Sequence, residues 1–237
     1  MPTYNEAKNV KILYNLILKL NLNADLLFID DNSLDGTGDI LDSIARENPC
    51  VRIIHRKEKS GVGSAHKEAI AYAYKNGYKT LITMDADFSH RPEDIPLFLG
   101  LSQLTDIVVG SRFLNADSLE EWNWYRTFLT HLGHKLTKYV LRCPYDATGA
   151  FRLYRLDKIN KNIFNLVESQ GYSFFFESLF FLANSGVSIR EVSITLPKRV
   201  YGSSKMRVTD VFKSLQMLIK LYFQLIKLRL KSKKIHG

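Results

Sequence analysis

The stretch TLITMDADFSH, Thr80 to His90, joins a short apolar run to two aspartates. The run 80–85 predicts a strand, because short apolar runs bounded by polar residues are typical of strands buried in a sheet. Asp85 and Asp87 lie two apart at its end, so on an extended backbone both carboxylates point to the same side. Two close carboxylates repel each other unless a cation lies between them or one takes a proton. The stretch therefore indicates either a divalent metal site or a solvated turn with incidental acids.

Further apolar runs precede and follow this stretch in the first half of the chain, and segments with helical spacing lie between them. This alternation predicts βαβ units and a mostly parallel sheet, in which ligands bind beyond the carboxyl ends of the strands. The predicted strands are 25–30, 51–55, 80–85 and 106–111. The predicted helices are 5–20, 38–46 and 64–76, the last capped by Ser64.

The second half of the chain is less regular. Its patterns predict a helix over 120–141, a short strand over 147–155 and a second strand over 188–198. No repeat or Pro/Gly-rich linker divides the sequence. We therefore expect one α/β domain over residues 1–206, followed by a basic amphipathic helix and tail over residues 207–237.

The composition restricts the classes of partner. The chain has 237 residues, a net charge of +9 and a pI of about 9.4, which favours a nucleic acid, a lipid headgroup or a phosphorylated substrate. Two cysteines make no disulfide framework and indicate a reducing compartment. The sequence shows no signal peptide, and lysines interrupt its most apolar region, so it predicts no transmembrane span.

A second acidic strand end occurs in FIDDNSLDGT, Phe28 to Thr37. Asp30 can accept hydrogen bonds from a nucleobase or a ribose, because a carboxylate offers only acceptors. Ser33 and Asp35 are expected to cap the following helix, which does not exclude that role. Gly61 and Gly63 lack the full glycine fingerprint of a phosphate cradle and favour a simple turn before a helix.

The C-terminal segment that begins at residue 208 has one polar stripe, made by Lys213, Gln216, Lys220, Gln224, Lys227 and Lys231. The other positions are largely apolar, and the basic sequence KLRLKSKK ends the segment. Such a helix can lie in a membrane interface, where each cationic residue adds about 1 kcal/mol near an anionic surface. The alternative is a helix packed on the domain with a solvated lysine edge.

Seven motifs, taken in order, resemble those of the dolichol-phosphate (polyprenyl-phosphate) mannose synthases, which are inverting family 2 glycosyltransferases of the GT-A (nucleotide-diphospho-sugar transferase) fold. The resemblance implies metal-dependent transfer of a hexose, mannose from GDP-mannose, to a polyprenyl monophosphate, with Mg²⁺ or Mn²⁺. The motifs are PTYNE (2–6), IDDNSLDGT (29–37), MDADFSHRPED (84–94), GSRF (110–113), DATGAFRLYR (146–155), GYSFFFE (171–177) and RVYGSSK (199–205).

The resemblance also implies roles for individual residues. Asp85 and Asp87 would bind the metal on the donor diphosphate, and an anionic acceptor phosphate would attack the anomeric carbon directly, so His90 is expected to be structural rather than a base. Arg126, in WNWYR, would meet the lipid phosphate and form the catalytic set with Asp87 and Arg112. The donor would be held by Pro2, Tyr4, Glu6, Phe28, Asp30 and the Ala86 backbone, with Arg112, Arg199 and Lys205 on the phosphates.

The sequence departs from the family at two places that matter here. Relatives have a hydrophobic strand before PTYNE, whereas Met1 immediately precedes Pro2, so we expect the native start to lie upstream of Met1. Ser89 stands where some relatives carry a glutamine ligand, which leaves a place for water in the metal shell.

The expected location is the cytoplasmic face of a membrane, to which the chain binds peripherally through the C-terminal helix or through a membrane-anchoring protein partner. Two alternatives remain. One is a related transferase that uses UDP-glucose or another acceptor. The other is a nucleic-acid-binding protein, which the concentration of lysines in the tail disfavours.

Overall fold

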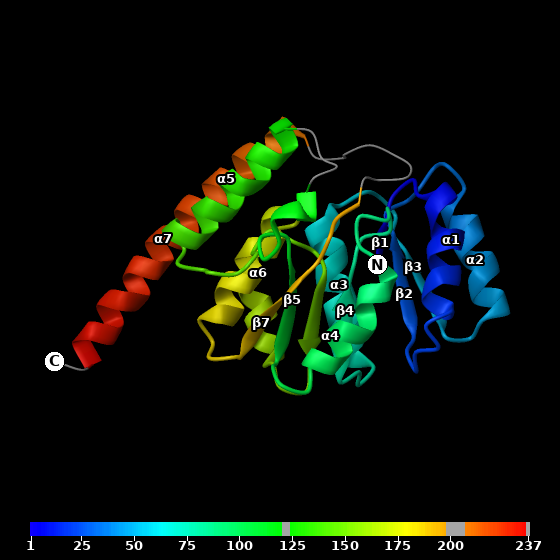
Figure 1. The fold of residues 1–237 in the computed structure, drawn as a ribbon, viewed down its shortest axis with the longest axis horizontal. Coiled ribbons are helices and arrows are strands. Elements are labelled where there is room, and N and C mark those ends of the chain that lie inside the picture. The colour runs from blue at the N-terminus through cyan, green and yellow to red at the C-terminus, as the bar shows by residue number, and fades with distance from the viewer. Residues whose placement is uncertain (120–123, 198–206, 236–237) are drawn as a thin grey trace.

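The structure is a computed structural model, and it describes residues 1–119, 124–197 and 207–235. Its strands form two sheets (Figure 1). The first sheet is parallel, with the order β1 (Pro2–Thr3), β2 (Leu26–Asp30) and β3 (Val51–His55). The second has the order β4 (Thr80–Thr83), β6 (Arg152–Arg155), β5 (Ile107–Ser111) and β7 (Ile189–Ser193).

The second sheet differs from a simple run of βαβ units. β5 and β7 are parallel, but β6 lies between β4 and β5 and is antiparallel to both. Arg152 at the start of β6 is opposite Thr83 at the end of β4, so the ladder stops there. The predicted strand 80–85 therefore ends at Thr83, before the two aspartates. The predicted α/β class is confirmed, whereas sequence periodicity did not indicate the antiparallel insertion.

The helices cover the sheets and extend one end of the molecule. In Figure 1, α1 and α2 lie at one end beside β1–β3, and α5 and α7 lie at the other end. α4 and α6 were not predicted, because their continuous apolar sequences lack an amphipathic period. The helices are α1 (Ala7–Leu18), α2 (Thr37–Glu47), α3 (Val62–Lys75), α4 (Ile95–Leu101), α5 (Trp124–Val140), α6 (Ser173–Ala183) and α7 (Val208–Ile235), with 3₁₀ turns η1 (Pro92–Asp94), η2 (Ala116–Leu119) and η3 (Lys161–Leu166).

Two local predictions are wrong. α3 begins at Val62 rather than Ser64, and the Ser64 hydroxyl donates to the carbonyl of Gly61 instead of capping the helix. The strand predicted over 147–155 contains only Arg152–Arg155, because the preceding segment forms an irregular loop around the buried carboxylate of Asp146.

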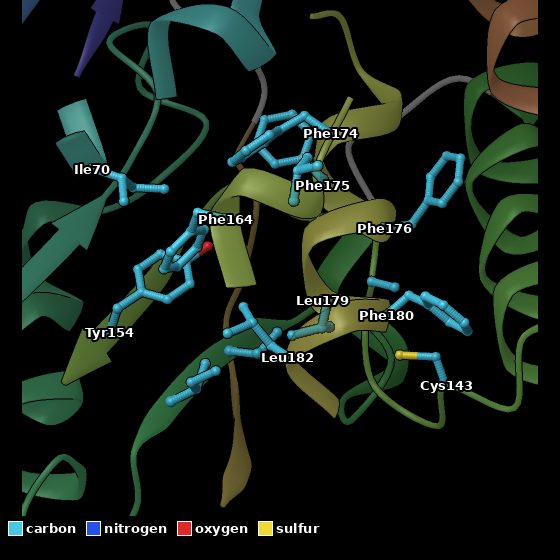
Figure 2. Close-up of a cluster of buried hydrophobic side chains, with 14 of the residues drawn as sticks. Ile70, Cys143, Tyr154, Phe164, Phe174, Phe175, Phe176, Leu179, Phe180 and Leu182 are labelled. Atoms are coloured by element: carbon cyan, nitrogen blue, oxygen red, sulfur yellow. The ribbon is translucent and has the colours of Figure 1, made fainter. Parts of the chain in front are cut away.

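The largest hydrophobic cluster surrounds α6, which is buried along almost its whole length. Figure 2 shows Phe176 and Phe180 on the side of α6 opposite Tyr154 and Phe164. α7 contributes Leu218, Leu221 and Leu225 to the same cluster. Packing against both the sheet and α7 explains why α6 is apolar all round.

α7 is long but carries lysines along its length. Within the described residues, no helix is both long enough and apolar enough to cross a membrane.

Candidate active site

Two loops at the carboxyl edge of the first sheet are bound together by side chains. The backbone N–H of Asn5 donates to the Ser33 hydroxyl, and Leu34 N–H donates to the Asn5 side chain. Asp35 accepts from the N–H groups of Ala7 and Thr37, so one carboxylate serves the starts of both α1 and α2. Partial burial raises the pKa of Asp35, but these bonds and that of the Thr37 hydroxyl hold it below its usual value. The expected capping by Ser33 and Asp35 holds only in part. Asp35 accepts from the first N–H group of α2, but Gly36 is the N-cap residue, and the Ser33 hydroxyl bonds to Asn5 and Asp30 instead.

Asp30 lies at the end of β2 and is buried. Its Oδ1 accepts from the Ser33 hydroxyl at 2.5 Å and the Thr3 hydroxyl at 3.2 Å, and its Oδ2 accepts from Ser33 N–H at 3.1 Å. Asp31 beside it forms an ion pair of 2.7 Å with Arg56. Asp30 is thus held in one orientation at the sheet edge, where we expected a nucleotide-binding carboxylate.

Most of the predicted donor-binding residues at the first sheet lie at its edge or in the loop after β1, whereas one lies in the hydrophobic core. Tyr4 and Glu6 lie in the loop after β1, and Lys59 stands 3.8 Å from the centre of the Tyr4 ring. Pro2 pairs with Ile29 at the edge of the first sheet. Phe28 does not belong with them. Its side chain is 0% exposed and packs in the core cluster of α1, α2 and β3, so the expectation that Phe28 contacts the donor is corrected.

Asp85 and Asp87 occupy the loop that leaves β4. Asp87 is 8% exposed, and its Oδ1 accepts from the Ser89 hydroxyl at 2.5 Å and from Ser89 N–H at 3.1 Å. Asp85 has a side chain that is one third exposed. Between them Ala86 is buried, and Phe88 has a φ of 63°, so the backbone turns sharply after Asp87. This loop is therefore a fixed turn rather than the extended strand that the spacing predicted.

His90 closes this turn. Its Nδ1 accepts from the backbone N–H of Asp85 at 2.9 Å, and its ring packs against Phe151 with centroids 5.1 Å apart. The ring is buried. The expected structural role of His90 is confirmed.

Arg112 follows β5 and forms a two-pronged ion pair with Asp146. Its Nε and Nη2 donate to the Asp146 carboxylate at 2.8 and 2.6 Å, and its backbone N–H donates to the same group at 3.0 Å. Burial lowers the pKa of Arg112, but Asp146, helped by Asp85, raises it above the usual value. The dependence on Asp85 indicates that the guanidinium lies within electrostatic range of the β4 loop.

Asp146 lies in the motif DATGAFRLYR but was not among the predicted site residues. The carboxylate is 0% exposed. A buried carboxylate needs a cation or several hydrogen-bond donors. An aspartate next to a predicted buried strand was therefore a signal that Asp146 has such a partner.

Three predicted site residues are not tested by these contacts. Arg199 and Lys205 lie outside the described residues. Arg126 lies in the first turn of α5, and its side chain is likewise outside the described part.

The carboxylates of the β4 loop are the candidate ligands for a divalent ion. Among the described residues, no group of three or more His, Cys, Asp and Glu side chains could hold a metal alone. Asp85 and Asp87 offer oxygen ligands, which Mg²⁺ and Mn²⁺ prefer, and Mg²⁺ commonly takes one or two carboxylates plus substrate phosphates. The loop therefore fits an ion that is shared with a diphosphate rather than one held by protein alone.

Comparison with known proteins assigns this arrangement to a family. The sequence profile of Glycosyl transferase family 2 matches residues 1–165. The chain belongs to this family. An undecaprenyl-phosphate mannosyltransferase of Micrococcus luteus is 35% identical to this glycosyltransferase over 207 residues, which cover 87% of this chain and 85% of the relative. A polyprenol monophosphomannose synthase of Mycolicibacterium smegmatis is 32% identical over 214 residues, or 89% and 81% of the two chains.

Solved structures support the GT-A fold of this glycosyltransferase. Mannosyl-3-phosphoglycerate synthase from Rubrobacter xylanophilus superimposes with a TM-score of 0.62 at 17% identity, covering 98% of this chain and 73% of that one. S. aureus TarS 1–349 in complex with UDP gives a TM-score of 0.56 at 15% identity, covering 95% and 63%. The expected family and fold are thus confirmed, and the nucleic-acid-binding alternative is set aside.

Proposed function

We propose that this family 2 glycosyltransferase moves mannose from GDP-mannose to a polyprenyl monophosphate with inversion at the anomeric carbon. The observation that carries the proposal is the pair Asp85 and Asp87, fixed by Ser89 and His90 within electrostatic range of Arg112. The names of the two relatives, both transferases of mannose to polyprenyl phosphates, supply the sugar and the acceptor class.

The chemistry needs positioned charges more than a general base. A phosphate monoester is already anionic near neutral pH, so one of its oxygens can attack the anomeric carbon as the bond to the nucleoside diphosphate breaks. Asp85 and Asp87 would hold Mg²⁺ or Mn²⁺, which supplies positive charge against the leaving diphosphate when bound. Arg112 would add a fixed guanidinium on the same side. Arg199 and Lys205 remain candidates for the phosphates, and Arg126 for the acceptor.

The donor nucleotide would lie against the first sheet. Asp30 is fixed at the end of β2, and Tyr4 and Glu6 are in the adjacent loop. These groups stand where α/β folds of this kind bind nucleotides, beyond the carboxyl ends of parallel strands. Asp30 would accept from the ribose or the base.

The lipid acceptor requires a membrane surface, and α7 has a face suited to one. One side of α7 packs on the domain, whereas a second apolar stripe is exposed at three- and four-residue steps. Lys213 and Lys227 are exposed next to this stripe. We expect peripheral binding to the cytoplasmic face of an anionic membrane through this stripe. It comprises Val208, Val211, Phe212, Leu215, Ile219, Tyr222, Phe223 and Ile226.

α5 adds to this surface. It contacts α7, and the two helices run side by side in Figure 1. Exposed apolar patches larger than a few hundred square ångströms mark binding surfaces more often than not. The exposed apolar side chains of α5 are Trp124, Tyr125, Phe128, Leu129, Leu132 and Tyr139.

A donor-selection assay tests the reaction. The protein is incubated with a short-chain polyprenyl phosphate, Mn²⁺ and one of GDP-mannose, UDP-glucose or UDP-N-acetylglucosamine, and the lipid product is identified by mass spectrometry. We expect mannosyl phosphopolyprenol from GDP-mannose. A product only from UDP-glucose would replace the proposed donor, and no product from any of the three would contradict the function.

A matched pair of variants tests the β4 loop. Asp87→Asn removes one proposed metal ligand and should reduce turnover at least about 100-fold, which is the scale of losing a main electrostatic contact in a transition state. Asp157→Asn removes an exposed carboxylate that pairs with Arg155 and should leave turnover unchanged. Full activity of Asp87→Asn would rule out the metal assignment.

A further inference from the structure

Three hydrogen bonds join Arg112 to Asp146. Besides the three bonds from Arg112 to Asp146, Nη2 donates to the Thr148 hydroxyl at 2.5 Å. The side chain of Arg112 is 9% exposed. Arginine and a carboxylate that meet in this fork geometry are fixed in direction as well as in distance.

Asp146 is itself fixed from behind. Its backbone N–H donates to Glu191 Oε1 of β7 at 2.7 Å. Burial raises the pKa of Asp146, yet Arg112 holds it below its usual value, so the carboxylate stays charged. The segment that follows is held on two more sides, since Arg152 Nη2 donates to the carbonyl of Ala147 at 2.8 Å and the Thr83 hydroxyl donates to the carbonyl of Ala150 at 2.7 Å.

These contacts use two of the three nitrogens of the guanidinium. Nε and Nη2 are bonded to Asp146 and Thr148, whereas Nη1 makes no hydrogen bond with any part of the protein that the structure describes. Asp85 acts electrostatically on the same group. A donor held by its other two nitrogens has little rotamer freedom to lose when it binds an anion.

We propose that Asp146 is a positioning residue, which locks the Arg112 guanidinium so that its Nη1 edge meets a phosphate oxygen of the reacting substrates. The proposal rests on the proposed function. Replacing the Asp146 carboxylate keeps the Arg112 side chain but lets its guanidinium change orientation. The loss should therefore fall mainly on kcat, because small errors of placement weaken transition-state contacts more than binding of the substrate.

A double-mutant cycle tests this proposal. Asp146→Asn and Arg112→Lys are made singly and together, and kcat and KM for GDP-mannose are measured. Asp146→Asn should lower kcat at least about tenfold with KM changed less than about threefold, and it should cost little more in the Arg112→Lys background. Effects on kcat that multiply in the double variant, or an unchanged kcat, would overturn the proposal.

The control is the other forked pair. Arg155 Nε and Nη2 donate to Asp157 at 2.9 and 2.8 Å, but this pair lies on the surface. Asp157→Asn should leave both kinetic constants unchanged. If Asp146→Asn does not fold, as judged by circular dichroism, Thr148→Val takes its place; it removes one bond to Arg112 and should lower kcat about threefold without changing KM.

A binding measurement separates this proposal from the proposed function. If the wild-type protein does not use GDP-mannose, the proposed function fails and the cycle is repeated on calorimetric affinity for GDP and for UDP, each with Mn²⁺. The terminal phosphate of a free nucleoside diphosphate carries the charge that forms on the leaving group in the transition state, so a contact that does not change KM for the sugar nucleotide should change this affinity. Asp146→Asn should then weaken nucleotide binding at least about fivefold, and only where Arg112 is present. Equal affinity of the wild-type and Asp146→Asn proteins would overturn the positioning role.

Discussion

At the scale of single residues, the acids of the site are held by hydroxyl groups two or three positions further along the chain. Ser33 donates to Asp30, Thr37 to Asp35 and Ser89 to Asp87. Such local bonds fix a carboxylate before any ligand arrives, and they favour turns over continued strand. Ser89 was read from the sequence only as a replaced ligand. Its spacing from Asp87, the same as that of Thr37 from Asp35, was a signal for this second role.

His66 is a buried residue of a different kind. It is 1% exposed and its ring contacts those of Phe174 and Phe175, and its Nε2 has no hydrogen-bond partner among the residues that the structure describes. Burial, with smaller contributions from Arg152 and His90, lowers the pKa of His66 well below 6.5. The folded protein therefore keeps this imidazole neutral.

The pH dependence of stability should reveal this imidazole. Below pH 6.5 the unfolded chain binds a proton that the folded chain does not, so stability rises with pH and is lost as the pH falls. Between pH 7.5 and 5.5 this loss amounts to about 1.4 kcal/mol for a group that stays neutral when folded. The His66→Met variant has a side chain of similar volume that does not titrate. Between pH 7.5 and 5.5 its free energy of unfolding, measured with denaturant, should fall by about 1.4 kcal/mol less than that of the wild type. Parallel pH profiles for the two proteins would contradict the assignment.

At the scale of elements, α7 shows the packing on the domain that was one of the two alternatives left open by its sequence, and the membrane-interface alternative stays a prediction. Leu218, Leu221 and Leu225 pack on the domain, as expected of a docked helix, yet a second apolar stripe stays exposed. Lys220 forms an ion pair with Glu168 of the domain, whereas the sequence alternative placed it among solvated lysines. Periodicity predicted one polar stripe correctly, but it could not divide the apolar positions between two faces, because that division depends on where α6 lies.

The exposed stripe of α7 should determine membrane binding. Phe212→Ser with Phe223→Ser removes two exposed rings, each worth about 1.5–3 kcal/mol when fully buried. We expect at least tenfold weaker co-sedimentation with vesicles that contain anionic lipid, and little binding of either protein to neutral vesicles.

Leu104→Ser is the matched control for this experiment, because Leu104 is 65% exposed but follows α4 and belongs to neither α5 nor α7. It should bind vesicles like the wild type. Unchanged binding of the double Phe variant would contradict the membrane role and leave a protein partner as the occupant of the stripe.

At the scale of the whole molecule, the candidate site lies where two sheets meet. Asp30 belongs to the end of the first sheet, and Asp85, Asp87 and Arg112 follow strands of the second. Met1 and Leu26 pack against the hydrophobic clusters of both sheets. A nucleotide and a metal that bridge this boundary would stabilise the molecule as one unit.

Thermal unfolding should therefore depend on both ligands together. A ligand at 100 times its Kd stabilises by about 2.7 kcal/mol, which corresponds to a rise in Tm of about 5 °C or more for a chain of this size. GDP with Mn²⁺ should give this rise, and each alone should give much less. Asp87→Asn should lose the joint effect, and Asp157→Asn should keep it. A full shift with GDP alone would contradict the shared metal.

The sequence predicted those parts of the fold that depend on neighbours in the chain. β2, β3, β4 and β5 begin at or within one residue of the predicted starts, because each is a short apolar run bounded by polar residues. The position of β6 depends on pairing with strands far away in the sequence, which no local period records. The same holds for Asp146 in the site, whose partner Arg112 lies in a different motif.

The place of β6 also sets an order for assembly. The three strands of the first sheet are all present once residue 55 has left the ribosome, whereas β4 obtains its neighbour only when residues 152–155 have been made. Contacts between distant segments form slowly, because a long loop must close before they yield any stabilisation. We expect the first sheet, β1–β3, to be structured early in synthesis. The β4 loop should take its final shape only after about two thirds of the polypeptide has been made.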